Sequence, residues 1–150
     1  MNTALRDKAL TLLSYRAHSR KELSDKLKQK TSCDESDLDD ILTWLEDMGF
    51  LNDRHYAASV VRHAASKGYG ASRIMAELNR RGISKDLWEE ALSEIPESDD
   101  TLDRLVRTKL RDPDDRDEVR RVSAALIRRG YTWDEVRRAM GRLETEKEFP

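Results

Sequence analysis

The chain repeats one pattern three times, and this repeat restricts its possible folds more than any other feature. When Leu27, Leu78 and Leu126 are aligned, the offsets between successive copies are 51 and 48 residues. The residue four positions earlier is apolar in every copy, and three positions of a closing segment are apolar as well. A repeat of this length indicates one supersecondary unit that buries its apolar face against its neighbours.

The apolar spacing within each copy is helical. Residues such as Leu5 and Ala9 recur three or four positions apart, and alternation of period two is nearly absent. We therefore predict an all-α fold of three tandem three-helix repeats at 1–51, 52–96 and 97–150, the last with a short polar C-terminal tail. Because 39% of the residues are charged and only 37% hydrophobic, the core is thin by the standard of globular domains. This composition favours an elongated, curved rod.

Glycines mark the ends of the predicted helices. Gly49, Gly82 and Gly130 each follow a helical segment and precede an apolar residue. Glycine suits the left-handed position just after a helix, and the apolar residue behind it packs back on the last turn. The sequence thus predicts the same helix end in all three repeats.

Helix starts carry a signature of their own. Ser19 with Glu22, and Thr132 with Glu135, have the spacing of a capping box, in which each side chain accepts a backbone N–H. Ser84 stands in the equivalent place of the second repeat, and we expect its hydroxyl to cap the next helix.

The segment KGYGASRI at 67–74 resembles a phosphate-binding glycine loop. Such a loop needs G-x-G-x-x-G/A after a strand, whereas here Arg73 occupies the sixth position and the preceding segment is helical. We interpret the segment as a tight turn in which Gly68 ends one helix and Gly70 caps the next.

Residues with catalytic or metal-binding spacing are not found. His18, His55 and His63 lack the i,i+4 spacing of a helical zinc pair, and Cys33 has no evident histidine partner. The acidic segment 112–118 lacks the mid-loop glycine of a calcium loop and is expected to be a turn followed by an acidic first helical turn. We predict no catalytic residue, no metal and no cofactor, and therefore no enzyme.

The location of the protein is predicted from what the chain contains. A single cysteine allows no internal disulfide, which suits a reducing compartment. The first ten residues lack the apolar core of a signal peptide, and no run approaches the ~20 apolar residues of a membrane-spanning helix. We expect a cytoplasmic protein with no membrane contact.

Charge is unevenly distributed along the chain. The net charge of −2 disfavours a generic nucleic-acid binder. Residues 34–47 nevertheless hold seven acids and no base. Solvation explains such an acidic patch, and a basic partner surface is the alternative. The patch consists of Asp37, Asp39, Asp40, Glu46 and Asp47.

Arginines dominate the opposite half, where residues 104–142 hold twelve bases and seven acids. The spacing of Arg104, Arg107 and Arg111 is expected to place them on one helix face. Cations near helix ends stabilise the carbonyl terminus, and dense arginine also suits phosphates or carboxylates. As candidate partner-binding residues we select Arg73, Arg80, Arg81, Arg104, Arg107, Arg111, Arg120, Arg121, Arg128 and Arg129.

Four motifs in this order resemble the RecX family, regulators of the RecA recombinase. They are S-x-x-E-L-x-x-K-L at 19–27, G-F-L-N-D-x-x-Y-A at 49–57, K-G-Y-G-x-x-R-I-x-x-E-L-x-x-x-G-I at 67–83 and L-x-x-R-G-Y at 126–131. The resemblance implies an all-helical fold of tandem three-helix units in a bacterial cytoplasmic protein. It also implies binding in the groove of the RecA filament on single-stranded DNA, with inhibition of ATP hydrolysis, strand exchange and repressor cleavage. Recombination, DNA repair and the SOS response would be modulated without any catalytic residue or cofactor.

Two alternatives to filament binding stay open. A direct DNA-binding regulator resembling helix-turn-helix proteins would place Arg73, Arg80 and Arg81 along a recognition helix. The net acidity and the position of the arginines at helix C-termini count against it. A generic helical scaffold is the other alternative, although the repeat is longer than the ~34 residues of tetratricopeptide arrays. We expect a monomer that touches single-stranded DNA indirectly or weakly.

Overall fold

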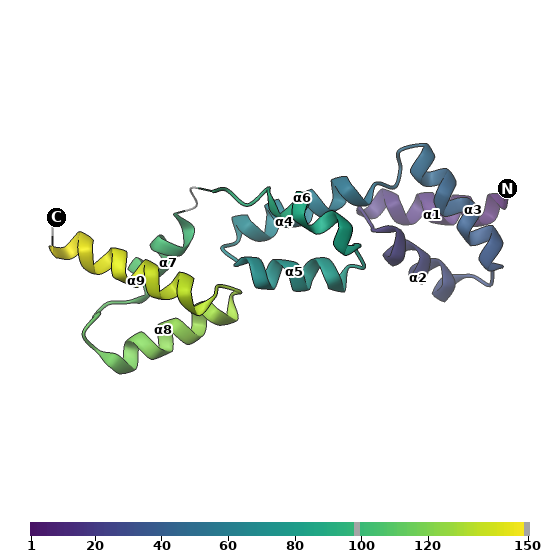
Figure 1. Cartoon of the computed structure of the whole chain (residues 1–150). Helices are drawn as coiled ribbons and strands as arrows, with labels where there is room; N and C mark the ends of the chain where they lie inside the picture. The colour runs from purple at the N-terminus through teal and green to yellow at the C-terminus, as the bar shows by residue number, and fades with distance from the viewer. Residues whose placement is uncertain (98–99, 149–150) are drawn as a thin grey trace. The chain divides into compact units, whose positions relative to one another are not determined.

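The computed structural model describes residues 1–97 and 100–148, and all regular structure within them is helical (Figure 1). The predicted all-α class is therefore confirmed. The helices are α1 (Thr3–Tyr15), α2 (Arg20–Lys30), α3 (Glu35–Asp47), α4 (Asp53–Ser66), α5 (Ala71–Arg80), the short 3-10 helix η1 (Lys85–Leu87), α6 (Trp88–Leu92), α7 (Thr101–Lys109), α8 (Arg116–Arg128) and α9 (Trp133–Glu148).

Three helices enclose each of two separate cores. Helices α1, α2 and α3 pack on one another through residues such as Leu23, Leu27 and Ile41, which are fully buried. Helices α7, α8 and α9 bury Val106 and Leu126 in the same way. Along the helices of both cores the buried residues recur three or four positions apart, as Leu23 and Leu27 do on α2, so each helix turns one apolar stripe toward its core.

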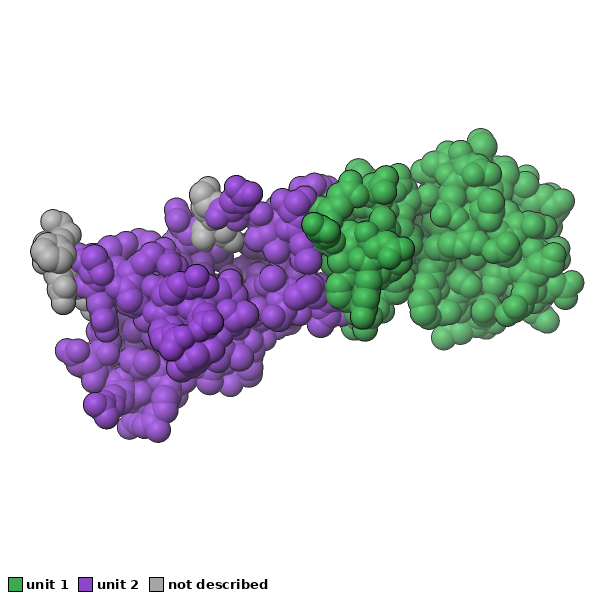
Figure 2. Space-filling view, in the orientation of Figure 1, with its two compact units in different colours: residues 1–60, 78–91 green, residues 61–77, 92–150 purple. Residues whose placement is uncertain are grey.

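By packing, the chain divides into two compact units, Met1–Val60 with Leu78–Ala91 and Val61–Glu77 with Leu92–Pro150 (Figure 2). The division passes through α4 and α5. It follows contacts rather than the repeat, so the limits predicted at 51/52 and 96/97 stay a prediction. We describe each unit by itself.

The predicted helix ends are confirmed. Gly49, Gly82 and Gly130 have φ of 80°, 74° and 104°. In each case the following N–H donates to a carbonyl five residues back, as with Ile83 N to Leu78 O at 3.1 Å. Gly68, with φ of 83°, ends α4 in the same manner.

The predicted helix starts are confirmed at two of three places. Ser19 with Glu22 and Thr132 with Glu135 form reciprocal capping boxes. The prediction for Ser84 is wrong, because its hydroxyl makes no capping hydrogen bond. The segment begins as a tighter 3-10 turn in which the carbonyl of Ser84 accepts from Leu87 N at 3.0 Å.

The C-terminal residues differ from the prediction in part. Residues 144–148, assigned to the polar tail, continue α9, while 149–150 lie outside the described residues. None of the helices in the described part of the chain has the length and apolar character to cross a membrane.

Candidate interaction surface

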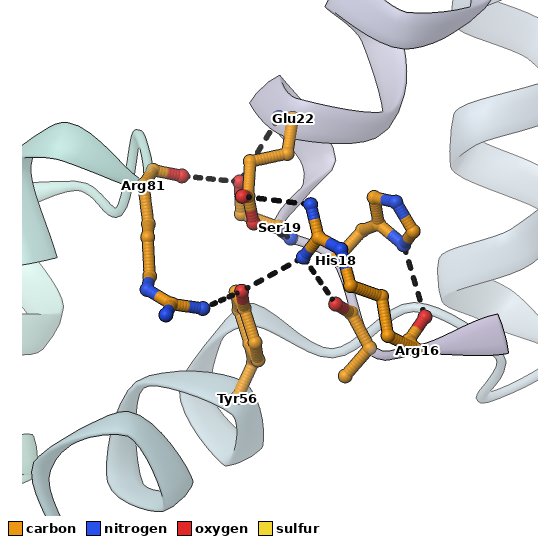
Figure 3. Close-up of polar contacts among 7 residues, drawn as sticks. Arg16, His18, Ser19, Glu22, Tyr56 and Arg81 are labelled. Atoms are coloured by element: carbon orange, nitrogen blue, oxygen red, sulfur yellow. Dashed lines mark hydrogen bonds and ion pairs between the residues drawn. The ribbon is translucent and has the colours of Figure 1, made fainter. Parts of the chain in front are cut away.

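The first unit contains a junction where the N-terminus of α2 meets the carbonyl end of α5 (Figure 3). The Ser19 hydroxyl donates to the carbonyl oxygen of Arg81 at 2.5 Å and accepts from Glu22 N at 3.0 Å. A helix N-terminus carries partial positive charge and a carbonyl end partial negative charge, so this arrangement is electrostatically favourable. We call it the first joint, made of residues 16–22 with Tyr56, Arg81 and Gly82.

Tyr56 lies at the centre of the first joint. Its hydroxyl accepts from Arg81 Nη1 at 2.5 Å and from Arg16 Nη1 at 3.4 Å, and Arg81 Cζ stands 5.7 Å from the ring centroid. The hydroxyl is also hydrogen-bonded to Glu22. Burial raises the pKa of Tyr56, and the bond to Glu22 adds to the increase. One phenol thus connects three charged side chains.

Glu22 balances the two arginines. Its carboxylate accepts from Ser19 N at 3.0 Å and from Arg16 Nη2 at 3.3 Å. Burial alone would raise the pKa of Glu22, but the hydrogen bonds from Ser19, Tyr56 and Arg16 outweigh it, and the pKa is lowered. The first joint is therefore a network of opposite charges held inside one unit.

His18 is buried at the first joint, with only 4% of its surface exposed. Its Nδ1 lies 3.0 Å from the carbonyl oxygen of Arg16, and burial, helped by the charge of Arg16, lowers the pKa of the imidazole. From its spacing in the sequence, His18 is considered only as a metal ligand. Its place directly before the capping Ser19 could have revealed it, because that position usually packs against the first helical turn.

The acidic patch is partly neutralised from within. Arg20 pairs with Asp39 at 2.6 Å and with Glu46, and its backbone N–H donates to Asp53 Oδ1 at 2.8 Å. Within the described residues, no ion pair involves the other acids of the patch, which are Asp37, Asp40 and Asp47. Sequence reasoning missed Arg20 because it lies on a different helix.

The second unit contains an equivalent junction, where the N-terminus of α5 meets the carbonyl end of α8. Here Gly70 N donates to Arg129 O at 2.7 Å and Ser72 N donates to Gly130 O at 3.1 Å. A Cβ added to Gly70 would lie 2.4 Å from the carbonyl carbon of Gly130. We call this the second joint, made of residues 67–73 with 128–131, and at its centre two backbones touch directly.

Side chains reinforce the second joint. The buried Tyr131 donates its hydroxyl to Gly68 O at 2.9 Å, and Arg129 Nη2 donates to Lys67 O at 2.7 Å. Arg129 Cζ also stands 5.3 Å from the Tyr69 ring centroid, and Arg73 Cζ stands 3.8 Å from it. Two guanidinium groups therefore contact one tyrosine ring.

The structure separates the predicted arginines into internal and outward ones. Arg81 and Arg129, at equivalent places in the repeat, both turn inward and hold their joints together. Arg120 pairs with Asp117 at 2.5 Å. Arg80 is exposed at the end of α5.

The helix face predicted from Arg104, Arg107 and Arg111 is wrong in its last member. Helix α7 ends at Lys109, and Arg111 lies beyond it, with its backbone N–H donating to Glu118. The cause is local, because Pro113 disfavours a helical residue before it and Leu110 turns into the core in an extended conformation. Arg104 donates to Thr101 Oγ1 at 3.3 Å, and Arg107 lies 3.9 Å from Glu146.

Several bases of residues 104–142 are already paired. The guanidinium of Arg142 donates to both carboxylate oxygens of Asp103, and the shortest of these bonds joins Nη2 to Oδ1 at 2.7 Å. Arg137 pairs with Asp134. On α8, Arg121 and Arg128 are exposed, and neither forms an ion pair or side-chain hydrogen bond with another described residue. The excess of positive charge available to a partner is therefore smaller than the residue count suggests.

Within residues 1–97 and 100–148, no group of three or more histidine, cysteine, aspartate or glutamate side chains could hold a metal ion. The predicted segment 112–118 forms a turn and the first turn of α8, where Asp115 accepts from Asp117 N at 3.0 Å.

Comparison with known proteins assigns each repeat. Family models described as the first, second and third three-helix domains of RecX match residues 6–45, 52–92 and 97–140. The chain belongs to the RecX family. The resemblance seen in the motifs is thereby confirmed, and so is an architecture of three helical domains in series.

Relatives in the RecX family cover nearly the whole chain. The regulatory protein RecX of Halorhodospira halophila is 34% identical over 148 residues, covering 97% of this chain and 91% of that protein. The regulatory protein RecX of Bacillus subtilis is 32% identical over 148 residues, covering 95% of this chain and 56% of that protein. These matches support a role as a regulatory protein of the RecX type.

Solved structures agree with the fold. The crystal structure of RecX from Lactobacillus salivarius superposes with a TM-score of 0.79 at 27% identity, covering 95% of this chain and 96% of that one. A second crystal structure, of regulatory protein RecX, has a TM-score of 0.76 at 23% identity and supports the fold alone. None of these matches gives a role to a single residue, so the selected arginines and acids stay predictions.

The RecX motifs coincide with the two joints. The motif at 19–27 opens with the capping serine of the first joint, and the motif at 67–83 opens with the residues of the second joint. These motif residues form the contact between the N-terminus of the second helix of one domain and the carbonyl end of the second helix of the next domain.

Proposed function

We propose that this chain binds the RecA filament on single-stranded DNA, lies in its helical groove and inhibits the recombinase. The inhibited activities are ATP hydrolysis, strand exchange and co-protease action, and through them recombination, DNA repair and the SOS response are modulated. The observation that carries the proposal is the succession of three RecX three-helix domains over residues 6–140.

Serial domains suit a repeating partner. In the proposal the three domains, with limits near 51/52 and 96/97, contact several filament subunits at once. Weak contacts made together bind far more tightly than each alone, because later contacts form at high effective concentration. Inhibition then follows from occupancy of the groove, and the protein acts as a cytoplasmic, cofactor-free monomer that catalyses no reaction.

The joints have a positioning role in this proposal. Arg81 and Arg129 are engaged in hydrogen bonds within their units, so they act by holding successive helices in place. Filament contact falls to exposed charges, namely Arg121 and Arg128 on α8 and Asp40 and Asp47 on α3.

The experiment is DNA-dependent ATP hydrolysis by RecA, measured with increasing amounts of the wild-type chain, together with strand exchange at saturation. We expect both activities to fall to a low plateau. Unchanged activities at saturating protein would remove the proposal. Electron microscopy of the same mixture checks that filaments still form, so loss of filaments is distinguished from inhibition of intact ones.

Direct binding to duplex DNA is the second candidate. Arg73 is the third residue of α5 and exposed, and recognition helices usually meet bases near their N-termini. Against it, Arg81 lies past the helix end and is bound to Tyr56. Sequence-selective duplex binding with a steep salt dependence, in the absence of RecA, would favour this candidate.

A further inference from the structure

The outer surface of the second joint gathers positive charge around an aromatic ring. Lys67, Arg73 and Arg128 are exposed there, and the half-buried Tyr69 lies between Lys67 and Arg73 in the sequence. Arg128 ends α8, directly before the residue whose carbonyl accepts from Gly70. All of these residues belong to one compact unit.

The tyrosine and one arginine form a stack. Arg73 Cζ stands 3.8 Å from the Tyr69 ring centroid, a distance typical of a guanidinium lying against an aromatic face. Arg73 is an exposed residue, so a ligand can approach its side chain from solvent. Arginine planes held in this way are surfaces on which unpaired bases stack.

Internal bonds fix the position of the stack. Arg129, which contacts the same ring at 5.3 Å, donates to the carbonyl oxygens of Lys67 at 2.7 Å and Gly68 at 3.4 Å. The Cα of Arg73 is held as well, since a Cβ on Gly130 would lie 2.5 Å from Arg73 Cβ. The binding surface is therefore largely formed before any ligand arrives, which lowers the cost of binding.

Of the acidic groups near the second joint, Glu135, Asp134 and Glu77 have other partners. Glu135 accepts from Thr132 N at 2.9 Å, and Asp134 pairs with Arg137. Glu97 lines a cleft of about 300 Å³ beside Tyr69, but Arg138 and Arg142 line the same cleft. Glu77, one turn beyond Arg73 on α5, is also engaged.

The first joint provides an internal reference. In the repeat register Glu22 occupies the place of Arg73, and its carboxylate neutralises Arg16. The first joint is thus charge-balanced on this side, whereas the second presents cations. The difference arises at equivalent positions, so it does not follow from the architecture that the joints share.

We propose that the surface formed by Lys67, Tyr69, Arg73 and Arg128 binds single-stranded nucleic acid directly. Phosphates lie against Lys67 and Arg128, and one base stacks on the outer face of the Arg73 guanidinium. A single strand fits better than a duplex because its bases expose their faces. An acidic polypeptide would satisfy the charges but would not use the stacked plane.

The test uses the full chain and a fluorescently labelled oligothymidine strand, with binding measured by anisotropy. We expect Arg73→Gln to weaken binding about tenfold, as loss of one stacked base predicts. Arg128→Gln should weaken it about threefold and reduce the salt slope by roughly 0.7, the value for one phosphate contact on a single strand.

Arg116→Gln is the matched control. Arg116 is the first residue of the same helix, exposed, and about 18 Å from Arg128 at a rise of about 1.5 Å per residue. It removes the same charge without touching the surface, so binding should stay within twofold of wild type. An equal loss in Arg116→Gln and Arg128→Gln would overturn the proposal, because net charge alone would then explain binding.

Two further arms test the stacked base. Arg73→Lys keeps the positive charge but removes the guanidinium plane. The variant should therefore keep the salt slope of binding but lose the preference for oligothymidine over an abasic strand of equal length. Equal binding of the abasic strand by the wild-type chain would overturn the stacking. Displacement by polyglutamate as effective as by unlabelled oligothymidine at equal charge would instead assign the surface to an acidic protein.

This inference is separable from the proposed function. The anisotropy assay contains no RecA, so a negative result leaves the inhibition of ATP hydrolysis untouched. Conversely, a chain that binds oligothymidine through Arg73 but leaves the ATPase unaffected would keep this surface and remove the proposed function.

Discussion

The two joints solve one problem with different chemistry. In both joints, the N-terminus of the second helix of one domain contacts the carbonyl end of the second helix of the next domain. At the first joint a serine hydroxyl reaches Arg81 O, and at the second the Gly70 N–H reaches Arg129 O. A side chain thus spans the gap in one case, and two backbones touch in the other.

This difference determines what each joint tolerates. The first joint depends on ionised groups around Tyr56, so its strength should change with pH and with charge. The second joint depends on the absence of a side chain at Gly70, so it should weaken as the volume of the residue at position 70 increases. Architecture is shared, while the sensitivity of each joint is set by its own residues.

The largest effect is expected from Gly70→Ala. The new Cβ would lie 2.4 Å from backbone atoms of Gly130, which have no flexible side chain to move. We expect a loss of about 3 kcal/mol in the free energy of unfolding, the upper part of the usual range for overpacking. Urea unfolding measures it.

Gly141→Ala is the control for this prediction. Gly141 lies inside α9 with no atom within 4 Å of an added Cβ. The change should stabilise the protein by about 0.5–1 kcal/mol, because alanine is the better helix former. If both variants unfolded at the same urea concentration, the close contact at the second joint would be refuted.

A smaller effect is expected from Gly82→Val at the first joint. Gly82 has φ of 74°, a conformation that a β-branched residue resists, and its Cβ would meet the Lys21 side chain at 2.7 Å. We expect a loss of about 2 kcal/mol. Gly49→Val has the same backbone strain with no neighbour within 4 Å, so thermal unfolding of the two variants separates strain from contact. An unchanged melting temperature in Gly82→Val would contradict both the backbone strain at Gly82 and its close contact with Lys21.

Removing one hydroxyl from each joint sharpens the comparison. Tyr56→Phe loses bonds to charged groups and should cost about 1.5 kcal/mol, whereas Tyr131→Phe loses a neutral bond to Gly68 O and should cost about 1 kcal/mol. Added salt should reduce the cost of Tyr56→Phe more than that of Tyr131→Phe. If added salt instead reduced the cost of Tyr131→Phe more, the first joint would not depend on its charges.

The smallest effect concerns acid. The pKa of Glu22 is lowered in the folded protein, so ionised Glu22 stabilises the fold above its unfolded value near 4.5, and this contribution is lost as pH falls through the folded pKa. Glu22→Gln should therefore be destabilised relative to wild type at neutral pH and lose that deficit in acid. Urea titrations at the two pH values check this. A deficit that stays constant would mean that the charge of Glu22 is not involved.

Asp53 supplies the contrary case in the same unit. Burial raises the pKa of Asp53, so its protonation favours the fold, and that contribution is present in acid and lost as pH rises through the folded pKa. Asp53→Asn should consequently change the pH profile of stability in the direction opposite to Glu22→Gln.

Short-range features could be predicted from the sequence. Helix ends at Gly82 and Gly130 and the capping box at Ser19 involve residues within five positions of each other, so the local pattern contains all the partners. The predictions for Ser84 and Arg111 are wrong although the causes are again local. The chain after Ser84 forms a tighter 3-10 turn, beside which Trp88 Nε1 donates to Ile83 O. Helix α7 ends before Arg111 because Pro113 disfavours a helical residue before it and Leu110 turns into the core in an extended conformation.

The candidate site was less predictable. Sequence reasoning selected Arg81 and Arg129 as outward contacts, yet both turn inward to Tyr56 and to Lys67 O. It treated Asp39 and Glu46 as parts of an open acidic patch, yet Arg20 binds both. Charge could be counted along the chain, but the pairing of charges depends on which helices are adjacent.

By itself, the sequence determined that the chain is helical, that it repeats three times and where most helices end, because these properties rest on bonds between near neighbours. The tertiary structure alone decided how domains join, because Ser19 and Arg81 lie 62 positions apart and Gly68 and Tyr131 lie 63 apart. At such separations, packing rather than spacing selects the partner. Two joints of one design consequently became a balanced charge network and a basic surface around Tyr69.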